Sequence, residues 1–372
     1  MLSRTTTRAV CTATLPHLIS SQVRPACAVL LRHAQTHSKR TFTSTTLVQR
    51  PQRNLPELKL KLESEYTHAE PAWPHPVYTA EQMEQIKIAH RRCDNWSDWA
   101  ALSAVRILRW SFDLATGYRH NKAVALDKKD PSAAKQKYSM SEEKWLTRLI
   151  FLESIAGVPG MVGGMVRHLH SLRVLRRDNG WIQTLLEESQ NERMHLLTFL
   201  KFREPGIFMR TMLLGAQGVF FNLFFVAYLV SPKTCHRFVG YLEEEAVVTY
   251  TRTIADLEAG FLPKWENMEA PQIAKDYFKL PEGKDKVIDL LHVVRADEAK
   301  HREVNHTLAN LEQNKDPNPY VAEFPKGAPR PTKGLEWVKG TGWEREELAK
   351  LAVLPVPVTV NTTATTAPTP SA

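Results

Sequence analysis

Two copies of one short motif carry residues that could bind metal ions. Residues 192–195 and 298–301 both read Glu-x-x-His. Residues three apart lie on one face of a helix, so each copy presents a carboxylate beside an imidazole. Two such helices, each joined by a lone glutamate from a further helix, supply the ligands of a di-iron carboxylate centre in a four-helix bundle. The expected ligands are Glu153, Glu192, His195, Glu243, Glu298 and His301.

The hydrophobic periodicity places these ligands inside a bundle. Apolar residues recur in alternating steps of about four and three, the spacing of a helical seam, and both motifs occupy seam positions. One seam comprises Val287, Leu291, Val294, Glu298, His301, Asn305 and Leu308. The other comprises Trp181, Leu185, Glu188, Glu192, His195, Phe199 and Phe202. Glu153 and Glu243 lie in two further seams, although Glu244 and Glu245 make the choice of Glu243 less certain.

The energetic cost of burying carboxylates favours a metal site over a structural explanation. An ionised carboxylate is very costly to bury without a partner. Four glutamates carry a charge of about −4, which two ferrous ions would neutralise. Oxygen and imidazole ligands suit iron or manganese. The alternative is that each Glu-x-x-His is an exposed pair on a solvated helix face, which would be the usual explanation of a single copy.

Tyr250 is a further candidate for chemistry. It follows Glu243 by seven residues, which is two helical turns, and so points in nearly the same direction. A tyrosine beside an oxygen-activating metal pair can supply an electron and a proton. From spacing alone, a core tyrosine with its hydroxyl bonded to a buried acceptor is an equally good interpretation.

The rest of the chain is organised around one helical region. Helices are expected over about 96–118, 141–164 and beyond, 178–202, 206–230, 232–259 and 282–313, and no alternating strand pattern of useful length occurs. The predicted class is all-α. The expected divisions are a transit peptide at 1–50, an irregular Pro-containing arm at 51–95, the helical bundle at 96–315, and a Pro/Gly-rich C-terminal extension with a disordered tail at 316–372.

The N-terminal segment is the basic part of the chain. The net charge is +9, and no Asp or Glu precedes Glu57, whereas Arg, Ser and Thr are frequent. This composition is typical of a mitochondrial transit peptide; a disordered basic tail is the alternative. Of the four cysteines only Cys93 and Cys235 lie outside this segment, in no metal-binding spacing, so neither a disulfide framework nor a zinc-thiolate site is expected. Basic clusters are short and lack interleaved aromatics, so nucleic-acid binding is not expected.

An apolar run at 212–230 could contact a membrane. It is long enough to span a bilayer. However, a simple crossing would place Glu192 and Glu243 on opposite faces of the membrane, although both must reach the same metals. The favoured interpretation is a helix lying in one leaflet, with the segment Trp99–Phe112 beside it. A buried helix is the alternative.

At these motifs the sequence resembles the alternative oxidases, the cyanide-insensitive ubiquinol oxidases of mitochondria. The matching stretches are residues 152–154, 191–196, 242–250 and 295–301. The charged loop at 119–137 resembles an insertion of the fungal members. Ser154 stands where many members have Thr, and no cysteine of the arm matches the regulatory cysteine of plant members, so activation by keto acids is not expected.

The resemblance implies roles for individual residues. The six Glu and His residues would hold two iron ions, Tyr250 would be redox-active, and Asn191 and Asp297 would orient ligands. His236 and Tyr277 match positions near the site. The residues that match the ubiquinol site are Arg109, Asp113, Arg148, Leu152, Leu242, Glu245, Ala246 and Thr249.

The resemblance also implies an activity, a fold and a location. The fold would be a ferritin-like four-helix bundle with two additional membrane-facing helices. The activity would be the oxidation of two ubiquinols by O2, giving two waters without proton pumping. The protein would be a monotopic homodimer on the matrix side of the mitochondrial inner membrane. The alternatives are another di-iron enzyme, such as a quinone hydroxylase or a desaturase, or a structural helical protein on the membrane.

Overall fold

The protein is described here by a computed structural model, which covers residues 71–118, 140–324 and 327–351. These residues belong to one compact unit, Glu70–Ala372. Their regular structure is helical, apart from one isolated bridge between Glu269 and Lys286, so the all-α prediction is confirmed. The expected transit peptide, the charged loop at 119–137 and the C-terminal tail from residue 353 lie outside the described residues.

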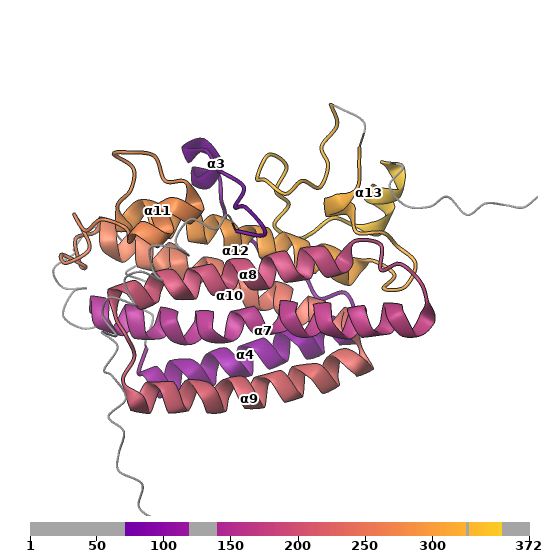
Figure 1. Ribbon diagram of the computed structural model, residues 1–372, viewed down its shortest axis with the longest axis horizontal. Coiled ribbons are helices and arrows are strands. Elements are labelled where there is room, and N and C mark those ends of the chain that lie inside the picture. The colour runs from indigo at the N-terminus through magenta and orange to yellow at the C-terminus, as the bar shows by residue number, and fades with distance from the viewer. Residues whose placement is uncertain (1–70, 119–139, 325–326, 352–372) are drawn as a thin grey trace, which may run out of the picture. The chain divides into compact units, whose positions relative to one another are not determined.

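Four long helices form the bundle that positions the motifs (Figure 1). They are α7 (Glu142–Val174), α8 (Trp181–Phe202), α10 (Pro232–Glu258) and α12 (Val287–Asn310). The closest pairings are α7 with α8 and α10 with α12. Every seam position predicted between Val287 and Leu308 is buried, including those occupied by polar residues. The periodicity therefore identified the inward face of α12 correctly.

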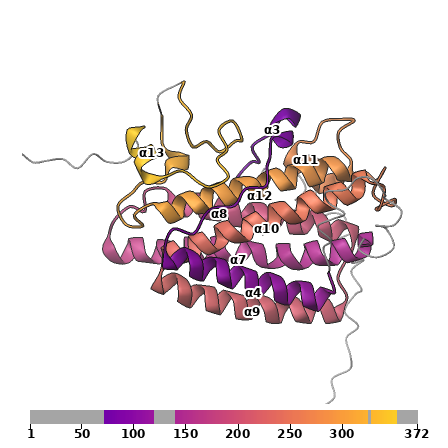
Figure 2. The same ribbon diagram turned by 180° about the vertical axis from the view of Figure 1, so that it is seen from behind.

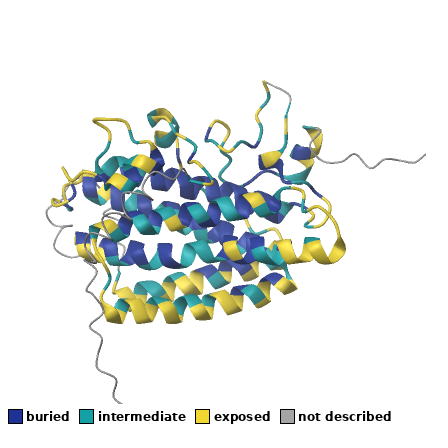
Figure 3. Cartoon of the chain, in the orientation of Figure 1, coloured by how far each residue is buried: buried dark blue, intermediate teal, exposed yellow. Residues whose placement is uncertain are grey.

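Two further helices, α4 (Trp96–Thr116) and α9 (Ile207–Val230), run along the lower edge of the bundle in both views (Figures 1 and 2). α4 packs on α10, whereas α9 packs on α7 and α10. Most residues of α9 are exposed, as are large apolar residues of α4 such as Trp110 and Leu114 (Figure 3). By length and composition alone, α7 and α9 could each cross a membrane, but half of the apolar window of α7 is buried. The buried alternative for the run at 212–230 is thus wrong for most of its residues.

The sequence did not predict the ends of α12 or the short helices. Residues 282–286 were expected to be helical, but Gly283 has a positive φ of 81°, and α12 begins only after Lys286, whose N–H donates to Asp289 Oδ2. The short helices α3 (Ala80–Glu84) and α11 (Gln272–Phe278) lie in segments expected to be irregular. Seven residues or fewer complete at most two turns, which is too short for a periodic pattern.

The C-terminal extension packs onto α12 as far as it is described. It contains the 3-10 helix η1 (Pro319–Val321) and the helix α13 (Arg345–Lys350). The fully buried carboxylate of Glu303 in α12 accepts hydrogen bonds from Tyr320 Oη at 3.0 Å and Trp343 Nε1 at 3.1 Å. The extension therefore covers the part of α12 that carries Glu303.

A glycine permits the close approach of α7 to α8. A Cβ placed on Gly160 would lie 2.4 Å from the carbonyl oxygen of Leu185, whereas one on Gly218 in α9 would meet nothing within 4 Å. A backbone carbonyl inside a helix cannot move aside as a side chain can. Gly160 therefore sets the distance between two helices that carry proposed ligands.

We predict that Gly160→Ala lowers the thermal unfolding midpoint of the purified protein. The clash should cost about 1–3 kcal/mol, which exceeds the gain of up to about 1 kcal/mol from replacing a helical glycine by alanine. Gly218→Ala is the matched control and should leave the midpoint unchanged or raise it. Equal midpoints for the two variants would contradict the close packing of α7 on α8.

Candidate metal centre

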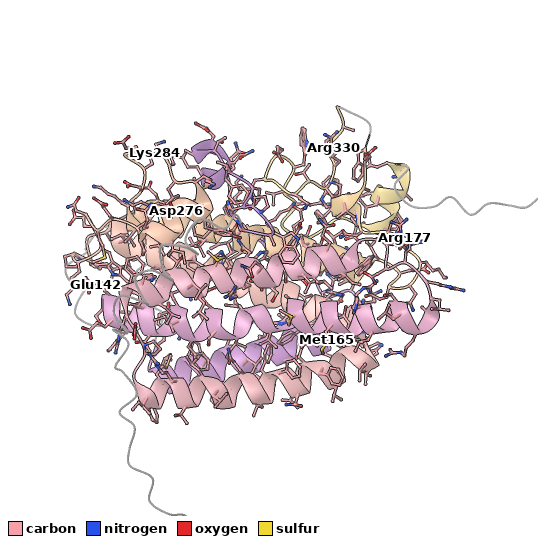
Figure 4. The ribbon with its side chains drawn as sticks, viewed as in Figure 1. Glu142, Met165, Arg177, Asp276, Lys284 and Arg330 are labelled. Atoms are coloured by element: carbon pink, nitrogen blue, oxygen red, sulfur yellow. The ribbon has the colours of Figure 1, made fainter. Side chains whose placement is uncertain are left out.

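The six predicted ligands come together from all four bundle helices. α7 contributes Glu153 and α10 contributes Glu243, while each Glu-x-x-His motif lies on one turn of α8 or α12. Figure 4 labels Glu142 at the start of α7 and Arg177 in the connection between α7 and α8, and shows side chains filling the space between the ribbons. All six side chains are buried. The structure thus brings together residues separated by up to 148 positions, which is 301 minus 153.

The ligand atoms form two overlapping groups of four. One group is Glu153, Glu192, His195 and Glu298; the other is Glu192, Glu243, Glu298 and His301. Within each group, one atom per residue can be chosen so that all lie within 4.8 Å of one another. Glu192 and Glu298 belong to both groups. Each group could hold one ion, and Glu192 and Glu298 would contribute to both.

The buried atoms of the cluster lack the partners that a structural ion-pair network would give them. His195 Nδ1 lies 3.3 Å from Glu153 Oε2, and His301 Nδ1 lies 2.7 Å from Glu192 Oε1. Nevertheless, Glu153 Oε2, His195 Nδ1 and both carboxylate oxygens of Glu192 have no well-aligned hydrogen-bond partner within the described residues. Buried polar atoms are normally paired. These unpaired oxygen and nitrogen atoms fit metal ions as their partners.

The electrostatics of the cluster also favour bound cations. Burial raises the pKa of Glu243 well above its usual range, and the neighbouring carboxylates of Glu298 and Glu192 raise it further. Burial likewise raises the pKa of Glu153 to about 8. Burial alone would lower the pKa of His195, but Asp297 and the nearby carboxylates raise it well above normal. A bound cation would reverse these pKa shifts, because it favours the ionised carboxylate and the neutral imidazole.

Asp297 organises the outer side of the centre. Its Oδ2 is hydrogen-bonded to His195 Nε2 and accepts from Asn191 Nδ2, both at 3.0 Å. Its Oδ1 is hydrogen-bonded to His75 Nε2 and accepts from Tyr78 Oη, both at 2.8 Å. With Nε2 held by a carboxylate, His195 presents Nδ1 to the metal position. Asn191 and Asp297 thus lie beside the cluster, and Asp297 is bonded to one of its imidazoles.

Sequence reasoning missed His75 and Tyr78. They lie in an arm that was expected to be irregular, 222 and 219 positions from Asp297. No periodicity applies to such a segment, so one sequence does not reveal a contact of this kind. The only available signal was a histidine and a tyrosine among the prolines of an otherwise featureless stretch.

Tyr250 contacts the cluster directly. Its hydroxyl donates a hydrogen bond to Glu153 Oε1, and its ring stacks on Phe199 with centroids 6.3 Å apart. Burial, followed by the charge of Glu153, raises the pKa of Tyr250 well above its usual value. The tyrosine is therefore protonated, and its hydroxyl proton is directed at a carboxylate of the centre.

The three consecutive glutamates of α10 separate into three environments. Glu243 joins the metal-binding groups. Glu244 accepts from Arg91 N at 2.7 Å and is hydrogen-bonded to His306 at 3.0 Å. Glu245 accepts from Arg109 at 3.1 Å. The choice of Glu243 from its seam agrees with this arrangement.

A second cluster lies between α4, α7 and α10 and contains the residues expected to bind ubiquinol. Arg109 donates to Asp113 at 2.9 Å and to Thr249 Oγ1 at 3.1 Å, and Arg148 donates to Asp113 as well. Arg148 also lies over the Phe112 ring at 4.3 Å. The remaining expected residues, Leu152, Leu242 and Ala246, are half-buried on α7 and α10.

The two additional positions also lie near the centre. Tyr277 Oη accepts from Asn191 Nδ2 at 3.3 Å. His236 is hydrogen-bonded to Tyr228 at 3.0 Å and to Asn305 at 3.2 Å. Burial lowers the pKa of His236 to about 3, so this imidazole is neutral.

A four-helix bundle with two overlapping carboxylate–histidine groups defines a dinuclear metal protein of the ferritin-like class. Residues 78–310 match the family model described as alternative oxidase. The chain is 58% identical over 328 residues to the mitochondrial alternative oxidase of Venturia inaequalis, covering 86% of this chain and 89% of that protein. It is 64% identical over 284 residues to that of Aspergillus niger (75% and 78%) and 57% identical over 283 residues to that of Neurospora crassa (75% and 77%). The chain belongs to the alternative oxidase family.

We predict that Glu243→Gln reduces metal binding whereas Glu245→Gln, two residues away on the same helix, does not. Loss of a partner that only orients a ligand already lowers metal affinity about 10–100-fold, so loss of a ligand should cost at least as much. Metal per chain is measured by mass spectrometry of the purified, dialysed proteins. Equal metal content in the two variants would remove Glu243 from the ligand set.

Proposed function

We propose that this chain is a ubiquinol:oxygen oxidoreductase that oxidises two ubiquinols and reduces one O2 to two waters at a di-iron centre, without pumping protons. The reaction balances, because two quinols release four electrons and four protons and O2 consumes the same number. The pair of metal-binding groups that share Glu192 and Glu298, in a chain of this family, carries the proposal. The enzyme would act as a cyanide-resistant terminal oxidase.

The donor set suits two iron ions. Four carboxylates and two imidazoles are the ligands that non-haem iron accepts, and the charge of about −4 is balanced by two ferrous ions. Glu153 and His195 would complete one ion's coordination, and Glu243 and His301 the other's. When bound, the pair passes electrons from quinol to O2. Asp297 would hold His195 in the tautomer that coordinates.

The cluster around Arg109 and Arg148 would bind the quinol head group. Its guanidinium groups and the hydroxyl of Thr249 are donors, and the carboxylates of Asp113 and Glu245 are acceptors. A quinol hydroxyl needs both kinds of partner, as it donates its proton and its oxygen becomes a carbonyl. Leu152, Leu242 and Ala246 would pack on the ring.

Tyr250 would supply a proton and an electron during O2 reduction. Its hydroxyl already donates to Glu153, a proposed ligand, so the proton has a short path into the centre. Because burial disfavours the phenolate, loss of the electron and loss of the proton would occur together. Reduction by quinol would restore the tyrosine.

The exposed apolar faces of α4 and α9 would lie in one leaflet of the membrane. Residues such as Trp110, Leu114 and Leu223 are exposed there, and a helix with an apolar face in the interface anchors a protein without crossing the bilayer. Quinol would enter from this leaflet. The relatives are mitochondrial, and we place this protein on the matrix face of the inner membrane as a homodimer.

We predict that the purified iron-loaded protein consumes O2 when a short-chain ubiquinol is added, with two quinols oxidised per O2. With ¹⁸O2 the label should appear in water and not in the quinone, because an oxidase does not transfer oxygen to its substrate. Mass spectrometry of quinone and water checks this. Label in the quinone ring would instead indicate a hydroxylase.

We predict that Tyr250→Phe retains the metal but loses turnover. Removing a positioned proton donor should lower kcat about 10²-fold or more, while the six ligands remain. Tyr241→Phe is the control, because Tyr241 is equally buried on α10 but is hydrogen-bonded to Cys93 outside the cluster. Normal turnover of the Tyr250 variant would contradict the role of the tyrosine.

A further inference from the structure

A cavity of about 110 Å³ lies beside the metal centre, on the side covered by the N-terminal arm. We call it the arm cavity. It lies between the arm at 73–78, α8, α12 and the C-terminal extension, and none of the eight residues expected to bind quinol lines it. The residues that carry the argument are His75, Glu188, Asn191, Tyr277, His301 and Tyr320.

The lining of the arm cavity includes residues of the metal cluster and residues of the protein surface. His301, a proposed ligand, and Asp297, which holds His195, belong to the first kind. Glu187 and Lys333 belong to the second kind; their side chains pair at 2.6 Å and are 21% and 50% exposed. Part of the lining is therefore accessible to solvent.

Two buried atoms of the lining residues need a donor that the protein does not provide. His75 Nδ1 and Asn191 Oδ1 have no hydrogen-bond partner within the described residues. The other polar atoms of both side chains are engaged, since His75 Nε2 and Asn191 Nδ2 are bonded to Asp297. A neutral imidazole that donates from Nε2 to a carboxylate presents Nδ1 as an acceptor, and an amide oxygen can only accept. The two remaining atoms are therefore acceptors.

Water is the ligand that fits both acceptors and the volume. An acceptor left unsatisfied costs about 1–3 kcal/mol, and a polar cavity of roughly 10–15 Å³ already holds one water. The carboxylate of Glu188 also lines the cavity and is held by Asn305 at 2.8 and 2.9 Å. Water molecules in the cavity would thus have several polar partners from the surface to the ligand shell.

We propose that the arm cavity is a hydrated port through which product water leaves the metal centre. The inference rests on the proposed function, in which every O2 gives two waters inside a buried cluster. The opposite side of the bundle carries the apolar faces of α4 and α9, where transfer of water is unfavourable. Quinol and water therefore use different sides of the bundle, and the arm forms one wall of the water side.

Hydroxyl-radical footprinting of the iron-loaded enzyme tests the hydration. Hydroxyl radicals formed by ionisation of water oxidise the side chains that lie beside that water. Tyr277 and Tyr320 should therefore be labelled at least about fivefold faster than Tyr228 and Tyr241, which are also buried but do not line the cavity. A pulse in H2¹⁸O should put ¹⁸O on the same two residues. Labelling no faster than at Tyr228 and Tyr241 would overturn the proposal.

Narrowing the cavity tests the exit of product. Val304 lines it and is not bonded to any ligand residue, so Val304→Phe should obstruct it, whereas Val304→Ile adds only one methylene. With metal content unchanged, Val304→Phe should slow labelling of Tyr277. The same substitution should lower kcat about tenfold and the KM for quinol by the same factor. The ratio kcat/KM should stay unchanged, because product water is released after the irreversible step.

The possible results distinguish failure of the proposed water port from failure of the proposed oxidase activity. A fall in kcat/KM equal to that in kcat, or an unchanged kcat with slower labelling, would overturn the port. Where Val304→Phe loses metal, Thr184→Leu narrows the same cavity from α8. Wild-type protein that takes up no O2 with quinol would overturn the proposed function itself. Uptake by a protein whose Tyr277 and Tyr320 stay unlabelled would overturn only the port.

Discussion

The mutual repulsion and desolvation of four buried glutamates is the constraint on which the structure depends. Glu192 and Glu298 are buried at the centre of the bundle, with Glu153 in one metal-binding group and Glu243 in the other, and the ligand atoms of each group lie within 4.8 Å of one another. No arrangement of the two neighbouring imidazoles alone pairs all their oxygens. Hydrophobic packing cannot compensate the charge that these carboxylates carry when ionised. The tight packing of α7 on α8 and of α10 on α12 keeps the four carboxylates from separating.

The two sides of the bundle differ because of what surrounds this charge. On one side, α4 and α9 present apolar residues outward, and Arg109 and Arg148 form a polar cluster beneath them. On the other, Asp297 links His195 to the arm through His75 and Tyr78. The two sides of the metal cluster therefore differ in chemistry. The side of α4 and α9 suits an amphipathic reductant, whereas the side of the arm suits hydrogen-bonded water.

The long helices and their inward faces could be predicted from the sequence because a seam repeats over many turns. Glu298 and His301 were placed in the core by Val294, Leu291 and Asn305 around them, and the structure buries them all. A carboxylate at a seam position is informative because it violates the pattern that the rest of the helix follows. This is why the buried positions of Glu298 and His301 could be predicted, whereas α3 and α11, which are too short to show a repeat, could not.

What the sequence could not predict depends on contacts between distant segments. His75 reaches Asp297 from an arm without periodicity, and Trp343 and Tyr320 reach Glu303 from an extension rich in Pro and Gly. Such contacts are set by the tertiary path of the chain. The arm cavity belongs to the same category, since its walls come from the arm, two bundle helices and the extension.

The contact between His75 and Asp297 also constrains the order of events during biogenesis. A chain that emerges from a ribosome or a translocation pore amino end first has its arm available early, but the residues that the arm must meet arrive 222 positions later. Until then, Glu153, Glu192 and His195 are present without Glu298 and His301. The complete metal-binding cluster consequently forms late, in the compartment in which the last third of the polypeptide is released.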